Sequence, residues 1–417
     1  MNAIRSARLL ALPPFLFDEI DRKKRERLAA GADVINLGVG DPDQPTPGFI
    51  VEEMNRAMRD LVNQQYPAVG GGLKVFREAA ARFMHTRFGV TVDPMRHIVA
   101  LLGSKDGIAH LPLGITNPGD TIIVPDPAYP VYEIGAVLAE CRVAKSPVRR
   151  ETGWKPTFAA PGGAMEGVDV ARLKREGSRA RLLWVNYPSN PCSSSADVAF
   201  YERVIEFCAG AATITGAPLI AASDLAYSEL YLDGPANKPP SIWQARNASI
   251  DETPAIEFHS LSKTFNMTGW RIGFAVGHAD VVGALNTVKS NMDSGTFNAI
   301  QAAGALALDR HDGPEVQRMR TLYRDRRDAL VPGLRAIGCE VDVPDAGFFV
   351  WARTPTGSDG SRVDSMTFAA KCLEQADVVV VPGGGFSPAG REYFRVALTV
   401  DSPRLREATQ RMRTIEW

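Results

Sequence analysis

The stretch that decides the fold runs from Ile256 to Val276 and reads IEFHSLSKTFNMTGWRIGFAV. Apolar residues at both ends frame a polar middle that contains Lys263. The hydroxyls of Ser260 and Ser262 flank this lysine, and Arg271 follows eight positions later. A lysine amine can form an imine with an aldehyde, while hydroxyls and a guanidinium are suited to hold a phosphate. The segment therefore predicts a phosphate-bearing cofactor attached to Lys263.

Composition restricts what kind of protein carries this segment. The chain has 417 residues, of which 45% are hydrophobic and 23% charged, which is typical of a globular protein with two domains. The formal net charge is -1, so neither nucleic acid nor an anionic membrane is expected as a partner. The five cysteines are far apart and odd in number, which indicates reduced thiols and a cytoplasmic location.

Short runs rich in Val and Ile alternate with longer helical patterns, which predicts an α/β domain with a mostly parallel sheet covered on both faces. The expected strands are His97–Leu102, Thr121–Val124, Arg181–Asn186, Pro218–Ala222, Ile256–Ser260 and Arg271–Val276. The expected helices are Ile50–Val62, Gly72–Arg87, Lys105–Thr116, Val131–Glu140, Val198–Ala209 and Asp280–Met292.

After about Asn298 the pattern changes to that of a smaller α+β domain. It contains two expected helices and three expected short strands, at Pro314–Ile337, Pro403–Thr414, Gly347–Ala352, Val378–Val381 and Tyr393–Ala397. The predicted boundaries are 1–45 for an N-terminal arm and part of the small domain, 46–297 for the large cofactor-binding domain, and 298–417 for the small C-terminal domain.

Polar residues follow the expected strands where an open α/β sheet binds its ligands. After His97–Leu102 comes Gly103-Ser104-Lys105, whose amides lie at the start of a helix and can bind a phosphate. An ordinary turn with Ser104 as a helix cap is the alternative. Tyr129 stands in a proline-rich loop that could hold it as a stacking plate for a flat ring.

Two further strand ends carry candidate ligands of a pyridine ring. Asn190, between prolines, could donate to a ring oxygen or a substrate carboxylate, although a turn asparagine is the alternative. Asp224 follows an apolar strand, and its carboxylate could keep a pyridine nitrogen protonated. Tyr227 could bind the ring hydroxyl. Asp224 could equally cap the following helix.

Two other residues concern a substrate. Arg395 lies within an apolar strand, where an unpaired guanidinium is costly unless it meets an anion. It could bind an α-carboxylate or form an internal salt bridge. Gly40 offers a backbone group that can approach a ligand closely, although a plain turn explains it as well.

Taken in order, these residues resemble the fold-type I class I/II aminotransferases over nearly the whole chain. The resemblance is strongest to the LL-diaminopimelate aminotransferase group, through Leu12–Asp21, Gly107–Leu113 and the block from Lys263 to Gly277. It implies a three-layer α/β/α fold with a mostly parallel seven-stranded sheet, pyridoxal 5'-phosphate (PLP) as cofactor, and a homodimer with shared active sites. The expected substrates are an amino acid and a 2-oxo acid.

The resemblance also implies a role for each residue. Lys263 would bind the coenzyme and then shuttle the proton, Asp224 would pair with the pyridine nitrogen, and Tyr129 would stack on the ring. The ring oxygen would be bound by Tyr227 and Asn190. Phosphate ligands would be Ser104, Lys105, Ser260, Arg271 and, from the partner subunit, Tyr66; α-carboxylate ligands would be Arg395, Asn190 and Gly40.

One turn departs from the family pattern. Relatives commonly have Asn-Pro-Thr-Gly, whereas this chain has Asn190-Pro191-Cys192-Ser193. Losing the glycine removes backbone freedom, so the turn must adopt a conformation that serine tolerates.

Several functions stay open at this point. The amino donor could be LL-diaminopimelate, with 2-oxoglutarate as acceptor in lysine biosynthesis, or aspartate, alanine or an aromatic amino acid. The same fold also hosts carbon-sulfur β-lyases and decarboxylases. A regulatory module would normally carry a DNA-binding segment, and no helix-turn-helix pattern precedes Val39. The six histidines show no paired spacing, so no metal is expected.

Overall fold

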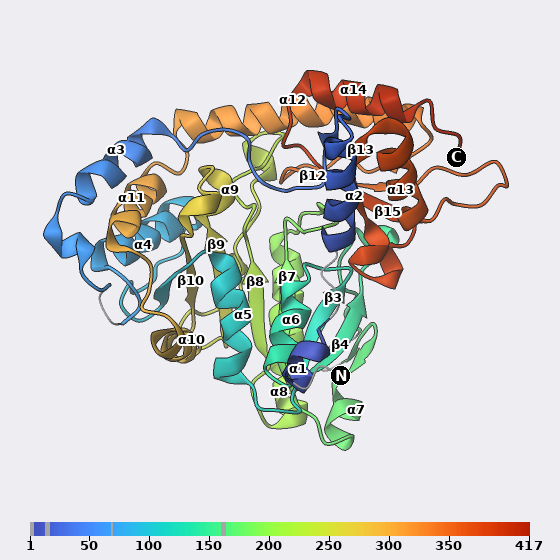
Figure 1. Cartoon of the computed structure of the whole chain (residues 1–417). Helices are drawn as coiled ribbons and strands as arrows, with labels where there is room; N and C mark the ends of the chain where they lie inside the picture. The colour runs from blue at the N-terminus through green and yellow to red at the C-terminus, as the bar shows by residue number, and fades with distance from the viewer. Residues whose placement is uncertain (1–3, 13–16, 68–69, 160–163) are drawn as a thin grey trace.

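The computed structural model describes residues 4–12, 17–67, 70–159 and 164–417. A larger sheet with helices on both faces fills the lower part of the view, and a smaller sheet lies above it (Figure 1). The long helix α12 (Pro314–Ala336) runs along the top of both. No helix among the described residues is long and apolar enough to cross a membrane.

The larger sheet has the strand order β2-β10-β9-β8-β7-β3-β4. Its strands are β2 (Ile98–Leu101), β3 (Thr121–Asp126), β4 (Arg142–Pro147), β7 (Ala180–Asn186), β8 (Ile220–Asp224), β9 (Ala255–Ser260) and β10 (Gly273–Gly277). Strand β10 is antiparallel to both neighbours, and the other pairs are parallel. The prediction of a mostly parallel seven-stranded sheet is therefore confirmed.

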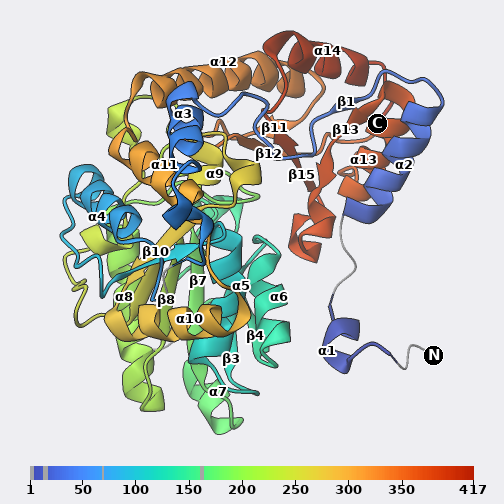
Figure 2. The same ribbon diagram turned by 60° about the vertical axis from the view of Figure 1, so that its left-hand side comes forward.

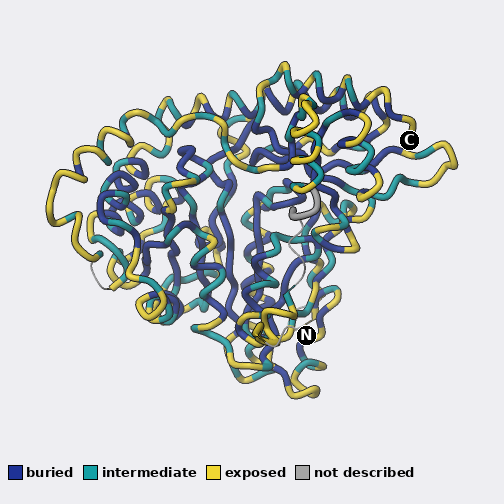
Figure 3. Tube along the Cα trace, in the orientation of Figure 1, coloured by how far each residue is buried: buried dark blue, intermediate teal, exposed yellow. Residues whose placement is uncertain are grey.

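Consecutive residues of each strand face opposite cores, which explains why these strands are continuous apolar runs. Ile122 and Leu182 belong to one core, whereas Ile123 and Leu183 belong to the other. The first core contains residues of α5 (Ser104–Ile115), α6 (Val131–Leu138) and α10 (Ala279–Met292). The second contains residues of α4 (Lys74–Phe88), α8 (Val198–Thr215) and α11 (Asn298–Asp309). Buried strands between exposed outer helix surfaces are visible in Figure 3.

The predicted elements of this region are present, with ends that differ by a few residues. The expected helix Ile50–Val62 is divided into α3 (Gly48–Ala57) and a short 3-10 helix, Leu61–Gln64. Strand β4 was not predicted from the sequence, because it lies at the edge of the sheet. An edge strand is partly exposed and therefore lacks the apolar run that marks its neighbours.

The smaller sheet is antiparallel, with the order β11-β12-β15-β14. Its strands are β11 (Glu340–Val341), β12 (Phe349–Arg353), β14 (Val381–Pro382) and β15 (Tyr393–Ala397). The expected strand Val378–Val381 is split, because β13 (Val378–Val379) pairs instead with β1 (Ile35–Asn36). Helices α13 (Ser365–Ala376) and α14 (Ser402–Met412) contribute to the core of this sheet.

The N-terminal segment touches both parts of the molecule. Helix α1 (Ala7–Leu10) lies against α6 of the larger sheet, whereas α2 (Phe17–Ala29) lies beside the smaller sheet (Figure 2). Residues 13–16 of the family-like stretch Leu12–Asp21 are outside the described residues. After β1, the chain stays bonded to the smaller sheet, since the amide of Ala397 donates to the carbonyl of Leu37 at 2.7 Å.

Arginines of α12 bind segments outside the smaller sheet. Arg326 forms two hydrogen bonds with Asp43, at 2.7 and 2.6 Å, and Arg320 donates to the carbonyl of Glu229 at 2.8 Å. Helix α11, which follows residue 297, packs against α3 and α4. The domain boundaries 1–45, 46–297 and 298–417 remain a prediction.

Candidate active site

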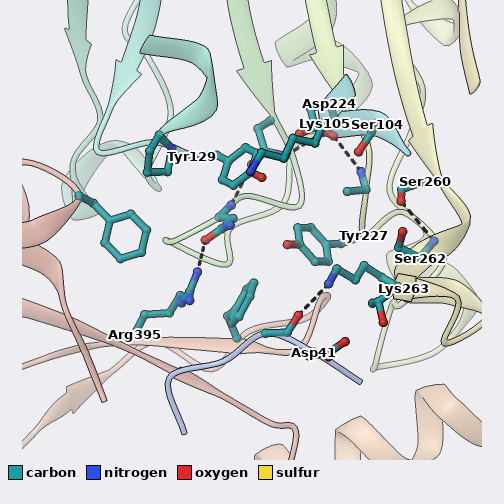
Figure 4. A pocket seen from close by; sticks show the side chains of 18 of the residues that line it. Asp41, Ser104, Lys105, Tyr129, Asp224, Tyr227, Ser260, Ser262, Lys263 and Arg395 are labelled. Atoms are coloured by element: carbon teal, nitrogen blue, oxygen red, sulfur yellow. Dashed lines mark hydrogen bonds between the residues drawn. The ribbon is translucent and has the colours of Figure 1, made fainter. Parts of the chain in front are cut away.

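A cavity of about 370 Å³ lies at the carboxyl ends of the parallel strands, between the two sheets. This volume is within the range of small-molecule sites. The predicted site residues that line it are Gly40, Ser104, Lys105, Tyr129, Asn190, Asp224, Tyr227, Ser260, Lys263, Arg271 and Arg395. Figure 4 shows Lys263 and Arg395 approaching the cavity from different sides. The fold therefore brings together predicted site residues that are separated by more than 300 positions in the sequence.

Lys263 lies on the short helix α9 (Leu261–Thr264), directly after β9. Its Nζ donates a hydrogen bond to the carbonyl oxygen of Gly40 at 2.7 Å. Burial lowers the pKa of this amine to about 8, and the nearby Arg271 and Arg395 guanidinium groups act in the same direction, whereas Asp41 opposes them. A lysine with a lowered pKa has more of the neutral amine that attacks a carbonyl.

A second group of residues forms a cradle for an anion. Ser104 is the first residue of α5, so its amide lies at the positive end of a helix. The Arg271 guanidinium lies next to Gly103, where an added Cβ would be only 2.4 Å from its Nη2. Hydrogen bonds to the carbonyls of Thr268 and Leu102, at 2.7 and 3.2 Å, hold this guanidinium. Helix dipole, hydroxyls and guanidinium together suit a phosphate.

Arg271 itself has a strained backbone. Its φ of +57° is in the left-handed region, which is uncommon for a residue with a side chain. Such strain persists only where the surrounding structure holds it, and it is found mostly at functional sites.

Asp224 ends β8 and is buried at the floor of the cavity. Burial raises the pKa of its carboxyl to about 6, against the effect of two hydrogen bonds that favour the ionised form. One comes from the hydroxyl of Tyr132 at 2.8 Å, and the other from the amide of Ala226 at 3.2 Å. Sequence reasoning missed Tyr132. Its position three residues after Tyr129 on the first turn of α6 was the available signal.

Arg395 on β15 is only 5% exposed. It donates to Asn190 Oδ1 at 2.7 Å and to the carbonyl of Gly38 at 3.1 Å. Its Nε has no hydrogen-bond partner among the described residues. The guanidinium stacks 4.1 Å from the ring centre of Phe349, and burial lowers its pKa to about 10. None of the described carboxylates pairs with it, so the salt-bridge alternative is not found and a bound anion would supply the missing partner.

Gly40 is required by its surroundings. A Cβ at this position would lie 2.5 Å from the ring of Phe349 and 3.3 Å from that of Phe348. These two aromatic rings, at the start of β12 and just before it, therefore approach the backbone of residue 40 directly, and the carbonyl of Gly40 accepts from Lys263.

Two tyrosines face the cavity beside Asp224 (Figure 4). Burial raises the pKa of Tyr129 to about 12 and that of Tyr227 further, so both hydroxyls stay protonated at neutral pH. Tyr66 lies elsewhere. It is 86% exposed and lines a different cavity, together with the segment 293–296.

In the turn that departs from the family pattern, Ser193 has a backbone conformation that favours glycine. Ser193 has a φ of +53°, in the left-handed region where glycine is at ease. Its amide donates to the carbonyl of Ser189 at 2.9 Å, and its hydroxyl donates to the carbonyl of Phe349 at 2.9 Å. These bonds hold the serine in a conformation that would otherwise be unfavourable, next to Asn190.

A group of potential metal ligands occurs outside the cavity. Asp106, His110 and Asp293 place ligand atoms within 4.8 Å of one another. The ammonium of Lys289, however, binds both carboxylates and lies 2.9 Å from Asp293. The positive charge that such a group needs is thus supplied by the protein.

The cavity residues fit PLP. The donor set at Ser104 and Arg271 matches a phosphate, the Asp224 carboxylate matches a protonated ring nitrogen, and the Lys263 amine lines the same cavity. The unpartnered Nε of Arg395 marks where a substrate carboxylate could bind.

The chain is similar to known proteins over nearly its whole length. Residues 32–412 match the family "Aminotransferase class I and II". The LL-diaminopimelate aminotransferase of Syntrophobacter fumaroxidans is 43% identical over 100% of both chains, and that of Aquifex aeolicus is 42% identical over 99% of both. Among solved structures, substrate-bound BacF from Bacillus subtilis superposes with a TM-score of 0.87 and 31% identity, covering 99% of this chain and 98% of that one.

Proposed function

The chain belongs to the class I and II aminotransferases, and we propose that within this family it transfers an amino group from LL-diaminopimelate to 2-oxoglutarate in lysine biosynthesis. As a family member it is a transaminase that uses PLP. The observation that carries the substrate proposal is the shared name of full-length relatives that are 41–44% identical to it.

Bound PLP supplies an electron sink for the amino acid's α-carbon. We assign to Lys263 the covalent attachment of the coenzyme and, once its amine is displaced, the removal and return of the α-proton at Nζ. The lowered pKa of Lys263 supports this role, because a base works best when its pKa is near the working pH. Asp224 would keep the ring nitrogen protonated, and Tyr129 would stack on the ring.

The remaining assignments follow from position in the cavity. Tyr227 and Asn190 would bind the ring oxygen of the coenzyme. Arg395, with Asn190 and the backbone of Gly40, would bind the α-carboxylate. This assignment is supported because no carboxylate among the described residues pairs with the Arg395 guanidinium. The phosphate ligands we assign are Ser104, Lys105, Ser260 and Arg271.

We also propose a homodimer in which Tyr66 of one subunit completes the phosphate site of the other. Tyr66 is outside the cavity of its own chain and is exposed. Nearby apolar side chains are exposed as well, since Leu61 and Val62 are 68% and 63% accessible. Exposed apolar groups of this kind favour burial against another protein surface. A cytoplasmic location is proposed because all five cysteines are free thiols.

A donor-acceptor screen with purified protein tests the substrate. LL-diaminopimelate with 2-oxoglutarate should be preferred over aspartate, alanine and tyrosine. Preference for one of these amino acids would overturn the substrate and keep the reaction. Release of pyruvate and ammonia from cystathionine, without glutamate formation, would indicate a carbon-sulfur β-lyase instead.

A further inference from the structure

Tyr132 is a fully buried tyrosine that does not line the cavity. Its ring stacks on Trp184, with centroids 4.8 Å apart and planes inclined by 15°. It also meets the ring of Tyr129 edge to face at 5.7 Å. A phenylalanine could make both ring contacts, so packing accounts for the ring but leaves the hydroxyl unexplained.

The hydroxyl has a specific partner. It donates to Asp224 Oδ2 at 2.8 Å, and the other carboxylate oxygen accepts from the amide of Ala226. Among the described residues, Tyr132 is the one side chain that donates to this carboxylate. Asn186 donates instead to the backbone carbonyl of Asp224, and His259 is engaged with Glu257 at 2.8 Å.

The Tyr132 hydroxyl keeps the proton that it donates in this hydrogen bond. Burial raises the pKa of the Tyr132 hydroxyl well above its ordinary value, so it stays protonated and remains a donor. The same burial raises the pKa of Asp224, which would tend to protonate the acid. A protonated Asp224 could not stabilise a positive charge on a ring nitrogen. A donor that opposes this tendency therefore bears directly on the coenzyme site.

We propose that Tyr132 is a positioning residue whose hydroxyl keeps the Asp224 carboxylate ionised and oriented toward the ring nitrogen of PLP. This inference rests on the proposed role of Asp224. Tyr132 would thus act on the charge of the ring nitrogen through Asp224, because its own side chain does not line the cavity.

The test compares two ligands of the coenzyme-free protein by equilibrium dialysis. One is PLP, and the other is its 1-deaza analogue, in which a carbon replaces the ring nitrogen. Tyr132→Phe should weaken PLP binding by roughly 10- to 100-fold, as expected for a lost hydrogen bond to a charged group. Affinity for the analogue should change by less than about twofold, the scatter of independent effects. A purely structural role would weaken both ligands equally and would overturn the inference.

Two further variants make the result unambiguous. Tyr323→Phe also removes a buried hydroxyl, one without a partner among the described residues, and should change neither affinity. Tyr132→Phe keeps the ring that stacks on Trp184, and its retained affinity for the analogue shows that it is folded.

Asp224→Asn separates this inference from the assignment on which it depends. If Asp224→Asn weakens PLP binding selectively while Tyr132→Phe does not, the role of Tyr132 is wrong and that of Asp224 stands. If Asp224→Asn leaves PLP binding unchanged, the proposed role of Asp224 is itself wrong.

Discussion

The Nζ of Lys263 donates a hydrogen bond to the carbonyl oxygen of Gly40 at 2.7 Å, and this bond joins the two halves of the site. Lys263 follows a strand of the larger sheet, whereas Gly40 belongs to a segment bonded to the smaller one. The hydroxyl of Thr399 donates to the carbonyl of Val39 at 2.8 Å, immediately before Gly40. The amine of Lys263 is thus bound by a segment of the smaller sheet, although Lys263 itself follows a strand of the larger one.

Gly40→Ala should impair catalysis. The new Cβ would overlap the ring of Phe349, on which the Arg395 guanidinium stacks, so both ring and guanidinium would be displaced. We expect kcat/KM to fall by roughly 100-fold, the effect of a misplacement of about 1 Å. Gly48→Ala is the matched control, because nothing lies within 4 Å of the Cβ added there. Equal kinetics for the two variants would contradict the prediction.

Coenzyme capture should depend on the protonation of Lys263. Burial lowers the pKa of this amine to about 8, so the reactive neutral form increases as the pH rises toward that value. Stopped-flow absorbance of the coenzyme-free protein mixed with PLP should show a rate that rises to about pH 8 and then levels off. Lys263→Ala should give neither the absorbance band of the lysine-bound coenzyme nor turnover. A rate still rising near pH 10 would point to an ordinary lysine.

Arg395→Leu should abolish recognition of the α-carboxylate without removing the coenzyme. Loss of one partner of a buried charge pair costs about 2–5 kcal/mol, which corresponds to a fall in kcat/KM of at least about 30-fold. Arg395→Lys should recover only part, since an ammonium lacks the bidentate fork. The exposed Arg391 provides the control Arg391→Leu, which should behave as wild type. Retained amino-acid affinity in Arg395→Leu would refute this role.

Ser193 should respond oppositely to two small substitutions. Ser193→Ala keeps the left-handed strain and loses the hydrogen bond to Phe349, so it should destabilise by about 1 kcal/mol. Ser193→Gly loses the same bond but relieves strain of about 1–2 kcal/mol, so it should be the more stable of the pair. Urea unfolding of the two variants measures the difference. Equal stability would show that the turn carries no strain.

Asp224→Asn should stabilise the coenzyme-free protein. The folded-state pKa of Asp224, about 6, exceeds its ordinary value of 3.8, so the folded state binds the proton more tightly. Stability is therefore lost as the pH rises through this window, and it stays lost above pH 6. Removing the buried charge should yield about 1–3 kcal/mol at pH 7.5 and little below pH 4. Unfolding curves at both pH values test this, and an unchanged difference would argue against it.

Much of the cavity could be predicted from sequence because its residues follow strand ends. Asp224 ends one largely apolar strand and Asn190 lies four residues after another, and the carboxyl ends of parallel strands meet at one edge. The local pattern therefore contained the information, and the fold brought these residues together. The fold class followed from the same runs, whose alternate residues face the two cores.

Other features depend on contacts that no local pattern contains. The sequence left Arg395 undecided between an anion and a salt bridge, because its partners Asn190 and Gly38 lie 205 and 357 residues away. Tyr132 was missed because its hydrogen bond to Asp224 spans 92 residues, and its spacing from Tyr129 was the one local signal. The pairing of β1 with β13 was missed because each strand has only two residues.

The division of the site between two sheets has a consequence for how it can open. Lys263 and Asp224, the proposed coenzyme anchors, follow strands of the larger sheet, whereas Arg395 and Gly40 belong to segments bonded to the smaller one. A movement of the smaller sheet would therefore shift Arg395 and Gly40 together and would leave Asp224 in place. Amino and oxo acids would then be exchanged while the coenzyme stays bound.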